Sequence, residues 1–174
     1  PNSAEVYYNM GFAFKAQGKL DKAIYSYKKA ISLKPDYVEA HNNMGLVLQE
    51  TGATKKAIQA FKKSISYRPD FAEAHHNLSY ALLNYGSYQE GLDEYEWRWK
   101  TDKYLTAYRH FSQPLWKKDI SLNGKTILIW CEQGVGDTIN WSSCISHVAS
   151  KAKHCILECQ EKIVPLLQRS FPNL

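Results

Sequence analysis

Apolar and small residues recur at a fixed spacing through most of the first half of this chain of 174 residues. Five positions return 34 residues later as a second set: Tyr7, Gly11, Ala23, Tyr27 and Pro35, then His41, Gly45, Ala57, Phe61 and Pro69. A third copy keeps four of these positions and lacks the proline: His75, Ser79, Gly91 and Tyr95. A period of this length predicts stacked pairs of helices, because each pair buries its apolar face only against the next pair.

Glycine and proline mark the boundaries of each predicted pair. Gly18, Gly52 and Gly86 fall between the two helices of a pair, where a residue without Cβ can take a positive φ. Pro35 and Pro69 follow the second helix, because proline disfavours helical geometry in the residue before it. Each repeat is therefore expected to contain two helices joined by a glycine turn.

Polar residues mark the expected start of each first helix. The predicted N-caps are Asn2, Asp36 and Asp70. A glutamate follows each of them three positions later: Glu5, Glu39 and Glu73. This is the spacing of a capping box, in which the cap and the glutamate both satisfy free backbone N–H groups. We expect the first helices to begin directly after these caps.

The glycine, alanine and proline positions together resemble the tetratricopeptide repeat family over residues 4 to about 105. The repeats would be residues 4–37, 38–71 and 72–105, within a domain of residues 1–105. The resemblance implies a right-handed superhelix whose concave groove is lined by the first helix of each pair. It also implies a protein or peptide partner in that groove.

An asparagine recurs in the first helix of every repeat: Asn9, Asn43 and Asn77. An asparagine amide has donors and an acceptor, so a row of them can pair with the backbone of an extended peptide. A similar asparagine row occurs in the repeats of O-linked N-acetylglucosamine transferase. The alternative is that each asparagine only bonds to the neighbouring repeat. The two interpretations stay open at this point.

Histidine and cysteine give no metal signature. His41 and His75 fill a position that usually holds a large apolar side chain, and one repeat of separation is too far for a shared ion.

None of the four cysteines forms a Cys-x-x-Cys pair: Cys131, Cys144, Cys155 and Cys159. If Cys155 and Cys159 share a strand, they lie about 13 Å apart, too far for a disulfide. We expect reduced, mostly buried thiols and no metal.

The repeat fails after Gly91, where an aromatic stretch begins with Tyr95-Glu96-Trp97-Arg98-Trp99. A second aromatic group, Arg109 to Trp116, follows. It lies in residues 106–122, which we expect to form an aromatic cap and linker. Such a cluster is expected to cover the open end of the helical stack. The alternative is a surface on which a sugar or peptide stacks.

Residues 123–174 have a different character. An apolar run at 126–131 predicts a buried strand, followed by a glycine-containing loop, a helix to about Ala152 and a second strand at 155–159. A short helix is expected near 162–170. Strand, helix and strand in this order predict a βαβ unit of Rossmann-like type. Two strands alone cannot bury both faces of a sheet, so we expect them to be partly exposed.

The stretch from Gly91 to the C-terminus resembles bacterial proteins in which tetratricopeptide repeats precede a glycosyltransferase domain of the heptosyltransferase type, with the GT-B fold. The residues that carry the resemblance are 95–99, Pro114-x-Trp116, 122–125 and Glu132-Gln133-Gly134-x-Gly136-Asp137-Thr138-Ile139. The resemblance implies that Asp137 is a general base and that Gly134, Gly136 and Thr138 form a substrate loop. The alternative is that Asp137 only caps the following helix. The third glycine of a dinucleotide fingerprint is absent.

Charge and composition exclude several classes of protein. The net charge is +5, and the basic residues are scattered in pairs, so no nucleic-acid-binding surface is expected. No run approaches membrane-spanning length and no secretory signal opens the chain, so no membrane span is expected. The expected reduced thiols favour a cytosolic compartment, so we expect a cytoplasmic protein.

The predicted fold is mainly α: a tetratricopeptide superhelix followed by an incomplete α/β lobe. The chain begins with the last residues of a repeat and closes after two strands of a sheet, so we expect it to be an excerpt of a longer protein.

The primary hypothesis is a protein-interaction module without enzyme activity of its own and without a cofactor. A nucleotide-sugar donor would require a full-length parent. The alternatives are the acceptor-binding half of an active sugar transferase and a non-catalytic assembly scaffold. An uncapped first repeat and a truncated sheet both favour self-association.

Overall fold

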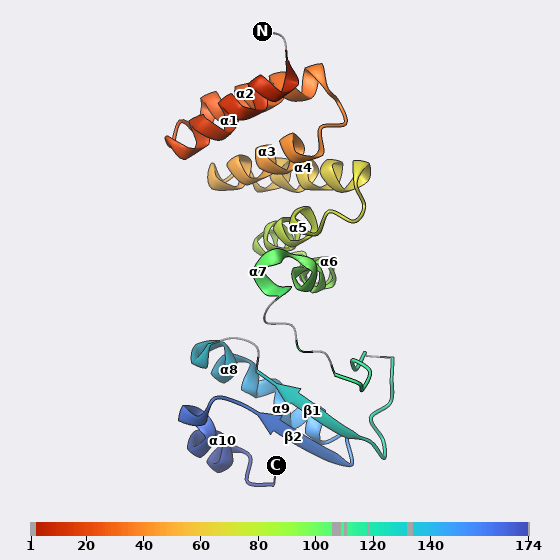
Figure 1. Ribbon diagram of the computed structural model, residues 1–174. Helices are drawn as coiled ribbons and strands as arrows, with labels where there is room; N and C mark the ends of the chain where they lie inside the picture. Colours follow the sequence, from red (N-terminus) through yellow and green to blue (C-terminus); the bar gives the residue numbers. More distant parts are fainter. Residues whose placement is uncertain (1–2, 106–108, 110, 118, 132–133, 174) are drawn as a thin grey trace. The chain divides into compact units, whose positions relative to one another are not determined.

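The computed structural model of this chain describes residues 3–105, 109, 111–117, 119–131 and 134–173. The chain divides into two compact units, Pro1–Tyr108 and Arg109–Leu174, which are described separately (Figure 1). The first unit is helical, and the second contains a parallel pair of strands with short helices. No helix within the described ranges is both long and apolar enough to cross a membrane.

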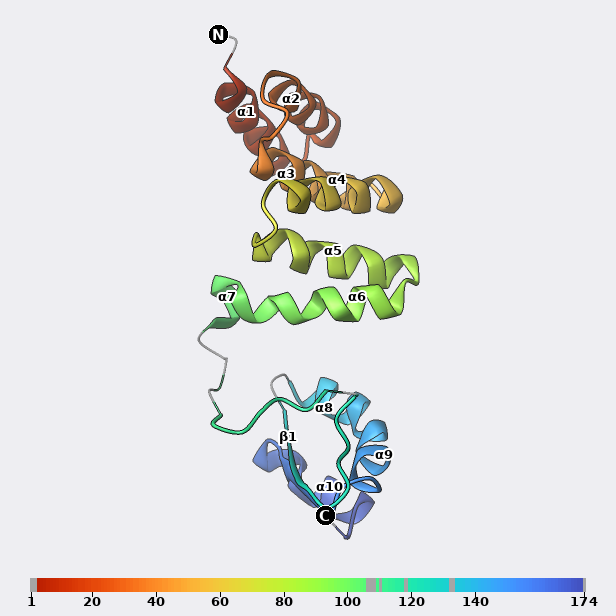
Figure 2. The same cartoon turned by 90° about the vertical axis from the view of Figure 1, so that its right-hand side faces the viewer.

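The first unit consists of three antiparallel helix pairs stacked in chain order (Figures 1 and 2). The helices are α1 (Ala4–Ala16), α2 (Leu20–Leu33), α3 (Val38–Glu50), α4 (Thr54–Tyr67), α5 (Ala72–Tyr85) and α6 (Tyr88–Tyr95). A 3-10 helix, η1 (Glu96–Lys100), and the short α7 (Asp102–Leu105) follow. The predicted helical repeat is confirmed.

The predicted turns are present within each pair. Gly18, Gly52 and Gly86 have φ values of 70°, 79° and 91°, a region that glycine enters without a Cβ penalty. The helices α2 and α4 end at Leu33 and Tyr67, two residues before Pro35 and Pro69. Both groups of residues therefore act as the sequence predicts.

The capping-box prediction is wrong. Helices α3 and α5 have Tyr37 and Phe71 as their N-caps, one residue later than expected, and neither makes a side-chain cap bond. The reason is a turn: the Tyr37 backbone N–H donates to the carbonyl of Lys34, at 3.1 Å. Pro35 and Asp36 are the two central residues of that turn, and proline is favoured at the first of them. Asp70 lies in the equivalent turn, and Asn2 lies outside the described residues.

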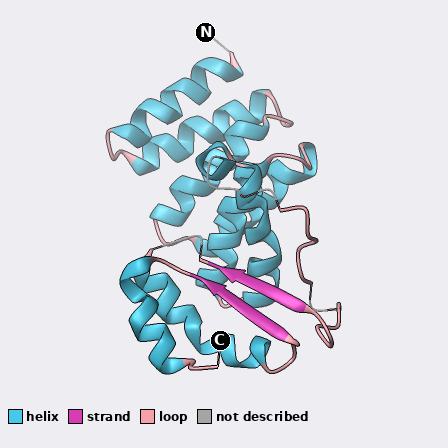
Figure 3. Cartoon of the chain, turned by 60° about the horizontal axis from the view of Figure 1, so that its bottom comes forward, coloured by secondary structure: helices cyan, strands magenta, loops and turns pink. Residues whose placement is uncertain are grey.

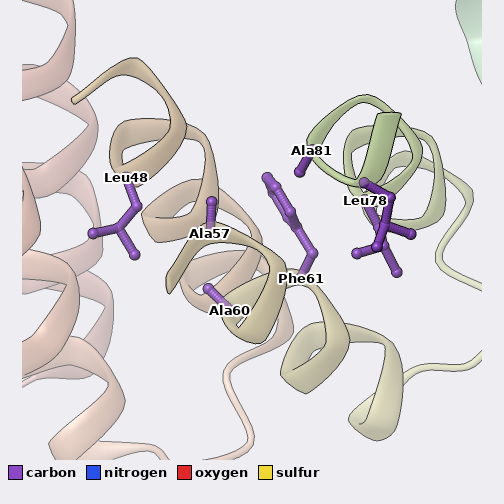
Figure 4. Packing of buried hydrophobic residues seen from close by; sticks show 7 residues of the cluster. Leu48, Ala57, Ala60, Phe61, Leu78 and Ala81 are labelled. Carbon is purple, nitrogen blue, oxygen red and sulfur yellow. The ribbon is translucent and has the colours of Figure 1, made fainter. Parts of the chain in front are cut away.

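The core of this unit is a chain of aromatic rings and alanines between successive helices. One cluster joins α3, α4 and α5 through Leu48, Ala57, Ala60, Phe61, Leu78, Ala81 and Leu82. The ring of Phe61 projects from α4 toward Ala81 of α5 (Figure 4). A second cluster places Tyr27 against Ala23 and Val47. Because Tyr27 and Phe61 are equivalent positions, one aromatic ring fills each interface between pairs.

The aromatic stretch after Gly91 covers α5. The ring of Trp97 stacks on His75, with centroids 3.9 Å apart and planes 4° apart. The Arg98 guanidinium lies 4.3 Å from the rings of both Tyr95 and Trp99. These residues cap the third pair in place of a further repeat.

The second half of the predicted cap belongs to the other unit. Phe111 lies 6.1 Å from Trp130, measured between ring centroids, and Arg109 pairs with Glu158. These side chains find partners on the strands of their own unit, and the expected cap and linker at 106–122 stays a prediction. Residues 106–108, 110 and 118 of the predicted 106–122 linker lie outside the described residues.

The second unit is built on two parallel strands, which lie side by side (Figure 3). Its elements are β1 (Thr126–Trp130), α8 (Val135–Trp141), η2 (Ser142–Cys144), α9 (Ile145–Ala149), β2 (His154–Glu158), η3 (Glu161–Ile163) and α10 (Val164–Ser170). The strands pair in register from Thr126 with His154 to Trp130 with Glu158. The predicted order of strand, helix and strand is confirmed.

The strands are partly exposed, as expected for a sheet of two strands, and the helix between them is not a single regular helix. Leu128 and Ile156 lie opposite each other on the two strands and are 38% and 54% exposed. The helix between the strands is interrupted by η2, where the hydroxyl of Ser142 donates to the Ile139 carbonyl at 2.7 Å. Such local bonds favour a tighter 3-10 turn over a regular helix.

Candidate functional site

Two of the three recurring asparagines tie successive first helices together. Asn43 Nδ2 donates to Tyr8 Oη at 2.8 Å, and Asn77 Nδ2 donates to Asn42 Oδ1 at 3.0 Å. Each donor thus bonds to a residue on the preceding first helix, as the alternative interpretation of the asparagine row describes. Each amide still has a second N–H and a carbonyl oxygen for another partner. Asn9 is exposed on α1.

The asparagines share a helix face with a glutamate and a large apolar residue in every pair. Spacings of four and seven residues place all three on one side of an α-helix. We call this surface the first-helix face, and it comprises Glu5, Asn9, Phe12, Glu39, Asn43, Leu46, Glu73, Asn77 and Tyr80. Phe12 is 61% exposed and Tyr80 40% exposed, so the face offers apolar area to a partner.

The glutamates of this face were missed as functional candidates. Their regular spacing is visible in the sequence, but it also matches the spacing of a capping box. Glu5 and Glu73 are exposed, and Glu39 forms an ion pair with Arg68, at 2.7 Å between Oε1 and Nη2. They are therefore surface carboxylates that a partner can reach.

The charges of the first unit are divided between its helices. Helices α3 and α5 contain no lysine or arginine, whereas α4 has four lysines and no acidic residue: Lys55, Lys56, Lys62 and Lys63. Burial raises the pKa of Tyr8, and the charge of Glu39 raises it further. The pKa of Tyr37 is likewise raised, first by burial and then by Tyr8, Glu5 and Glu39. The first-helix face thus presents three glutamate carboxylates, one of them paired with Arg68, although the whole chain is basic.

An aromatic group continues the face at the third pair. His76 contacts Tyr80 edge-on, with centroids 4.9 Å apart, and Tyr80 meets Tyr95 in the same way at 6.0 Å. Burial, followed by the proximity of Tyr95 and Tyr104, raises the pKa of Tyr80 to about 12. These side chains give the face a rigid apolar end.

His41 and His75 are packing residues. His41 Nε2 donates to the Pro35 carbonyl at 2.9 Å, and His75 Nε2 donates to the Pro69 carbonyl at the same distance. His75 Nδ1 also lies 2.5 Å from Glu94 Oε2. Within the described part of the chain, no three His, Cys, Asp or Glu side chains are grouped to hold a metal ion.

The second candidate site lies at the carboxyl end of β1. Gly134 precedes the first turn of α8, and Asp137 lies exposed in that turn. A Cβ on Gly134 would be 3.8 Å from Asp137 Oδ2, whereas a Cβ on Gly136 would meet nothing within 4 Å. Thr138 is buried, and its hydroxyl donates to the Gly134 carbonyl at 3.2 Å. Asp137 and Gly136 are accessible to a ligand, while Thr138 is engaged within the helix. Glu132 and Gln133 lie outside the described residues.

A large hollow in this unit lies at the opposite end of the strands. It has a volume of about 840 Å³ and is lined at the strand starts by Thr126 and His154, and by Phe171 near the chain end. The loop of Gly134 follows the carboxyl end of β1, so the hollow and the loop are separate places. The substrate loop that the family resemblance implies therefore does not lie in this hollow.

Comparison with family models identifies the repeats. The model described as TPR repeat matches residues 13–52, and the model described as Tetratricopeptide repeat matches residues 38–71. A comparison with curated proteins finds no match.

Solved structures of similar fold are found for part of this chain. A crystal structure of MamA is 30% identical, with a TM-score of 0.55, and the match covers 62% of this chain and 63% of that one. A second MamA structure is 29% identical, with a TM-score of 0.54 and coverage of 65% and 62%. The match thus spans less than two thirds of the length of either. The first tetratricopeptide domain of Spaghetti (RPAP3), bound to the HSP90 peptide SRMEEVD, shares the fold at 19% identity and a TM-score of 0.56, over 58% of this chain and 80% of that one.

Proposed function

Because residues 13–71 are tetratricopeptide repeats, which generally mediate protein–protein interaction, we propose that the first unit binds an extended peptide segment of a partner protein. The bound segment lies across the first-helix face and carries basic and apolar side chains. Residues of three successive first helices contact it, so its affinity comes from several small contributions.

The observation that carries this proposal is the repeated composition of the first-helix face. Each helix supplies a glutamate and an asparagine at the same two positions: Glu5 and Asn9, Glu39 and Asn43, Glu73 and Asn77. Lysine or arginine of the partner would pair with the carboxylates, and the free amide groups would pair with its backbone. Phe12 and Tyr80 would contact its apolar side chains.

The charge of the face also predicts what it rejects. The peptide SRMEEVD in the Spaghetti structure is acidic near its end. On this chain an acidic segment would meet the carboxylates of Glu5 and Glu73, and like charges brought together at an interface are unfavourable. We therefore propose selectivity against acidic peptides of that kind.

The test uses fluorescein-labelled peptides of equal length that differ only in charge, with SRMEEVD as an acidic member. Fluorescence anisotropy should give a Kd for basic peptides at least about tenfold lower than for acidic ones, with the difference shrinking in high salt. Glu5→Gln and Glu73→Gln together should weaken the basic peptides and leave neutral ones unchanged. Equal binding of acidic and basic peptides contradicts the proposal.

The asparagine contacts need a control, because Asn43 also holds α1 and α3 together. Asn43→Ala removes both its bond to Tyr8 and any bond to a peptide. Tyr8→Phe removes only the acceptor of the interhelix bond and leaves the amide in place. If Asn43 binds the peptide directly, Asn43→Ala weakens binding while Tyr8→Phe does not. Equal losses in both variants assign Asn43 a purely structural role.

A second candidate function is sugar transfer with Asp137 as the base, in which the second unit belongs to a glycosyltransferase-like domain of Rossmann-like type. The supporting observation is that Asp137 is exposed just beyond the carboxyl end of a parallel strand, the end at which α/β sheets bind ligands. The test is an assay of protein expressed from the complete reading frame against UDP-, GDP- and ADP-sugars. Asp137→Asn should lower the rate by about a hundredfold or more. Full activity of that variant excludes the role.

A further inference from the structure

Two cysteines become neighbours at the carboxyl ends of β1 and β2. The strands pair in register up to Trp130 and Glu158, and the next residues are Cys131 and Cys159. The backbone N–H of Cys131 donates to the Glu158 carbonyl at 3.2 Å, so the ladder continues one residue beyond β1. Paired strands lie about 4.8 Å apart. That separation is within the Cα–Cα range of disulfides, about 4.4–6.8 Å.

The side chains of this pair lie on the same side of the sheet. Residues at matched positions of parallel strands point the same way, and both thiols are half-buried and free. Burial raises the pKa of Cys159, and the charge of Cys131 raises it further, which is expected for two sulfurs close together. The other thiols are placed differently. Cys155 pairs with Ile127 across the sheet, and Cys144 is exposed in η2.

We propose that Cys131 and Cys159 form a reversible disulfide, a redox modification site at the carboxyl edge of the sheet. The oxidant is a low-molecular-weight disulfide such as oxidised glutathione. The Cys131 thiolate attacks one of its sulfurs, which forms a mixed disulfide and releases one glutathione thiolate. The Cys159 thiolate then attacks Cys131 Sγ, which forms the protein disulfide and releases the second glutathione. The two protons of the protein thiols pass to the released glutathiones, and the two electrons go to the small disulfide.

The order of these two attacks follows from the environment of the thiols. The raised pKa of Cys159 lowers its thiolate fraction at neutral pH, so it attacks second, when the mixed disulfide is already held beside it. The new bond would join the end of β2 to the residue from which the chain leads to Gly134 and α8. Oxidation would thus fix the strand end that precedes Asp137.

The site can be tested on the full chain because a glutamate-specific protease separates the four cysteines. Cleavage after Glu132, Glu158 and Glu161 puts Cys131 and Cys159 on different peptides and leaves Cys144 and Cys155 together on a third. Native protein is treated with oxidised glutathione, its remaining thiols are alkylated, and the digest is analysed by mass spectrometry. The expected product is a linked pair of peptides that contain Cys131 and Cys159, lost on treatment with dithiothreitol.

Matched variants complete the test. Cys131→Ser should abolish the link and leave Cys159 open to alkylation, whereas Cys144→Ser and Cys155→Ser should leave the yield of the link unchanged. Recovery of Cys131 and Cys159 only as alkylated or singly glutathionylated peptides overturns the proposal. The same holds for a link that forms only in guanidinium-unfolded protein, because it then does not depend on the pairing of the strands.

Discussion

Gly45 of α3 lies directly against the ring of Phe61 of α4. A Cβ built on Gly45 would be 2.5 Å from Phe61 Cε1, closer than real Cβ contacts come. The equivalent pair of the first repeat has the same relationship, since a Cβ on Gly11 would be 2.7 Å from Tyr27 Cε1. The glycine and the ring therefore define one close contact that the 34-residue period repeats, and it sets how near the two helices of a pair can approach.

Gly45→Ala should destabilise the first unit. The added methyl group overpacks the contact with Phe61 at a cost of about 1–3 kcal/mol, partly offset by the higher helix propensity of alanine, about 1 kcal/mol. Thermal unfolding followed by circular dichroism measures the loss. Phe61→Leu in the same protein makes room for the methyl group, so the double variant should lose less than the sum of the single ones. Strict additivity would show that the contact is not the cause.

Tyr27→Phe should stabilise the protein. Tyr27 is fully buried, and its hydroxyl has no hydrogen-bond partner among the described residues. An unsatisfied buried polar group costs about 1–3 kcal/mol, and the equivalent position, Phe61, has no hydroxyl. We expect a gain of about 1 kcal/mol in urea unfolding. Tyr25→Phe is the control, because Tyr25 is exposed and its change should leave the midpoint unmoved. A clear loss of stability in Tyr27→Phe would contradict the assignment.

The same residue predicts a loss of stability at alkaline pH. Burial raises the pKa of Tyr27 from 10.0 to about 12. Above pH 10 the unfolded chain ionises this tyrosine while the folded chain keeps it neutral, so the unfolded state is favoured as the pH rises to about 12. The wild type should lose up to about 2–3 kcal/mol through this group. Unfolding free energies measured from pH 9 to 12 should fall less steeply in Tyr27→Phe, and parallel curves would refute the prediction.

The sequence was sufficient for the elements that local chemistry decides. The 34-residue period, the glycine turns and the closing prolines each depend on residues close together in the chain, and all three have the predicted structure at Gly18, Gly52 and Pro35. The capping box failed because two local signals compete at Asp36. The turn that begins at Lys34 uses Asp36 as a central residue, so the helix starts one residue later.

The candidate sites depend on contacts between residues far apart in the sequence, so the sequence alone predicted them less completely. The bond from Asn43 to Tyr8 requires a particular rotation of the second helix pair against the first. The packing of Tyr27 and its neighbours decides that rotation, and no local sequence pattern reveals it. The strands at 126–131 and 155–159 were recognisable, but their register was not. Only the register shows that Cys131 has Cys159, and not Cys155, beside it.

His75→Leu should cost more stability than His41→Leu, although the two positions are equivalent. Both variants lose a bond to a proline carbonyl, but His75 also loses its contact with Glu94 and its stacking on Trp97. We expect about 1 kcal/mol for His41→Leu and about 2 kcal/mol or more for His75→Leu, from urea unfolding. Glu94→Gln in a wild-type background should account for part of the difference. Equal losses at the two positions would show that the aromatic cap does not stabilise the third pair.

Ser64 supplies a buried bond between two helices that has no equivalent in the first pair. Its hydroxyl donates to the Val38 carbonyl at 2.9 Å, and the residue is fully buried, whereas the corresponding position of the first repeat is Ala30. Ser64→Ala should lower the free energy of unfolding by about 1 kcal/mol, since a net intramolecular hydrogen bond is lost with little change in volume. Ser66→Ala removes an exposed hydroxyl that bonds to the Lys63 carbonyl, where water can replace it, and should change stability by less than about 0.5 kcal/mol. If both variants unfold at the wild-type urea concentration, the Ser64 bond does not hold α4 to the start of α3, and the packing of Ala57, Ala60 and Phe61 alone fixes that pair.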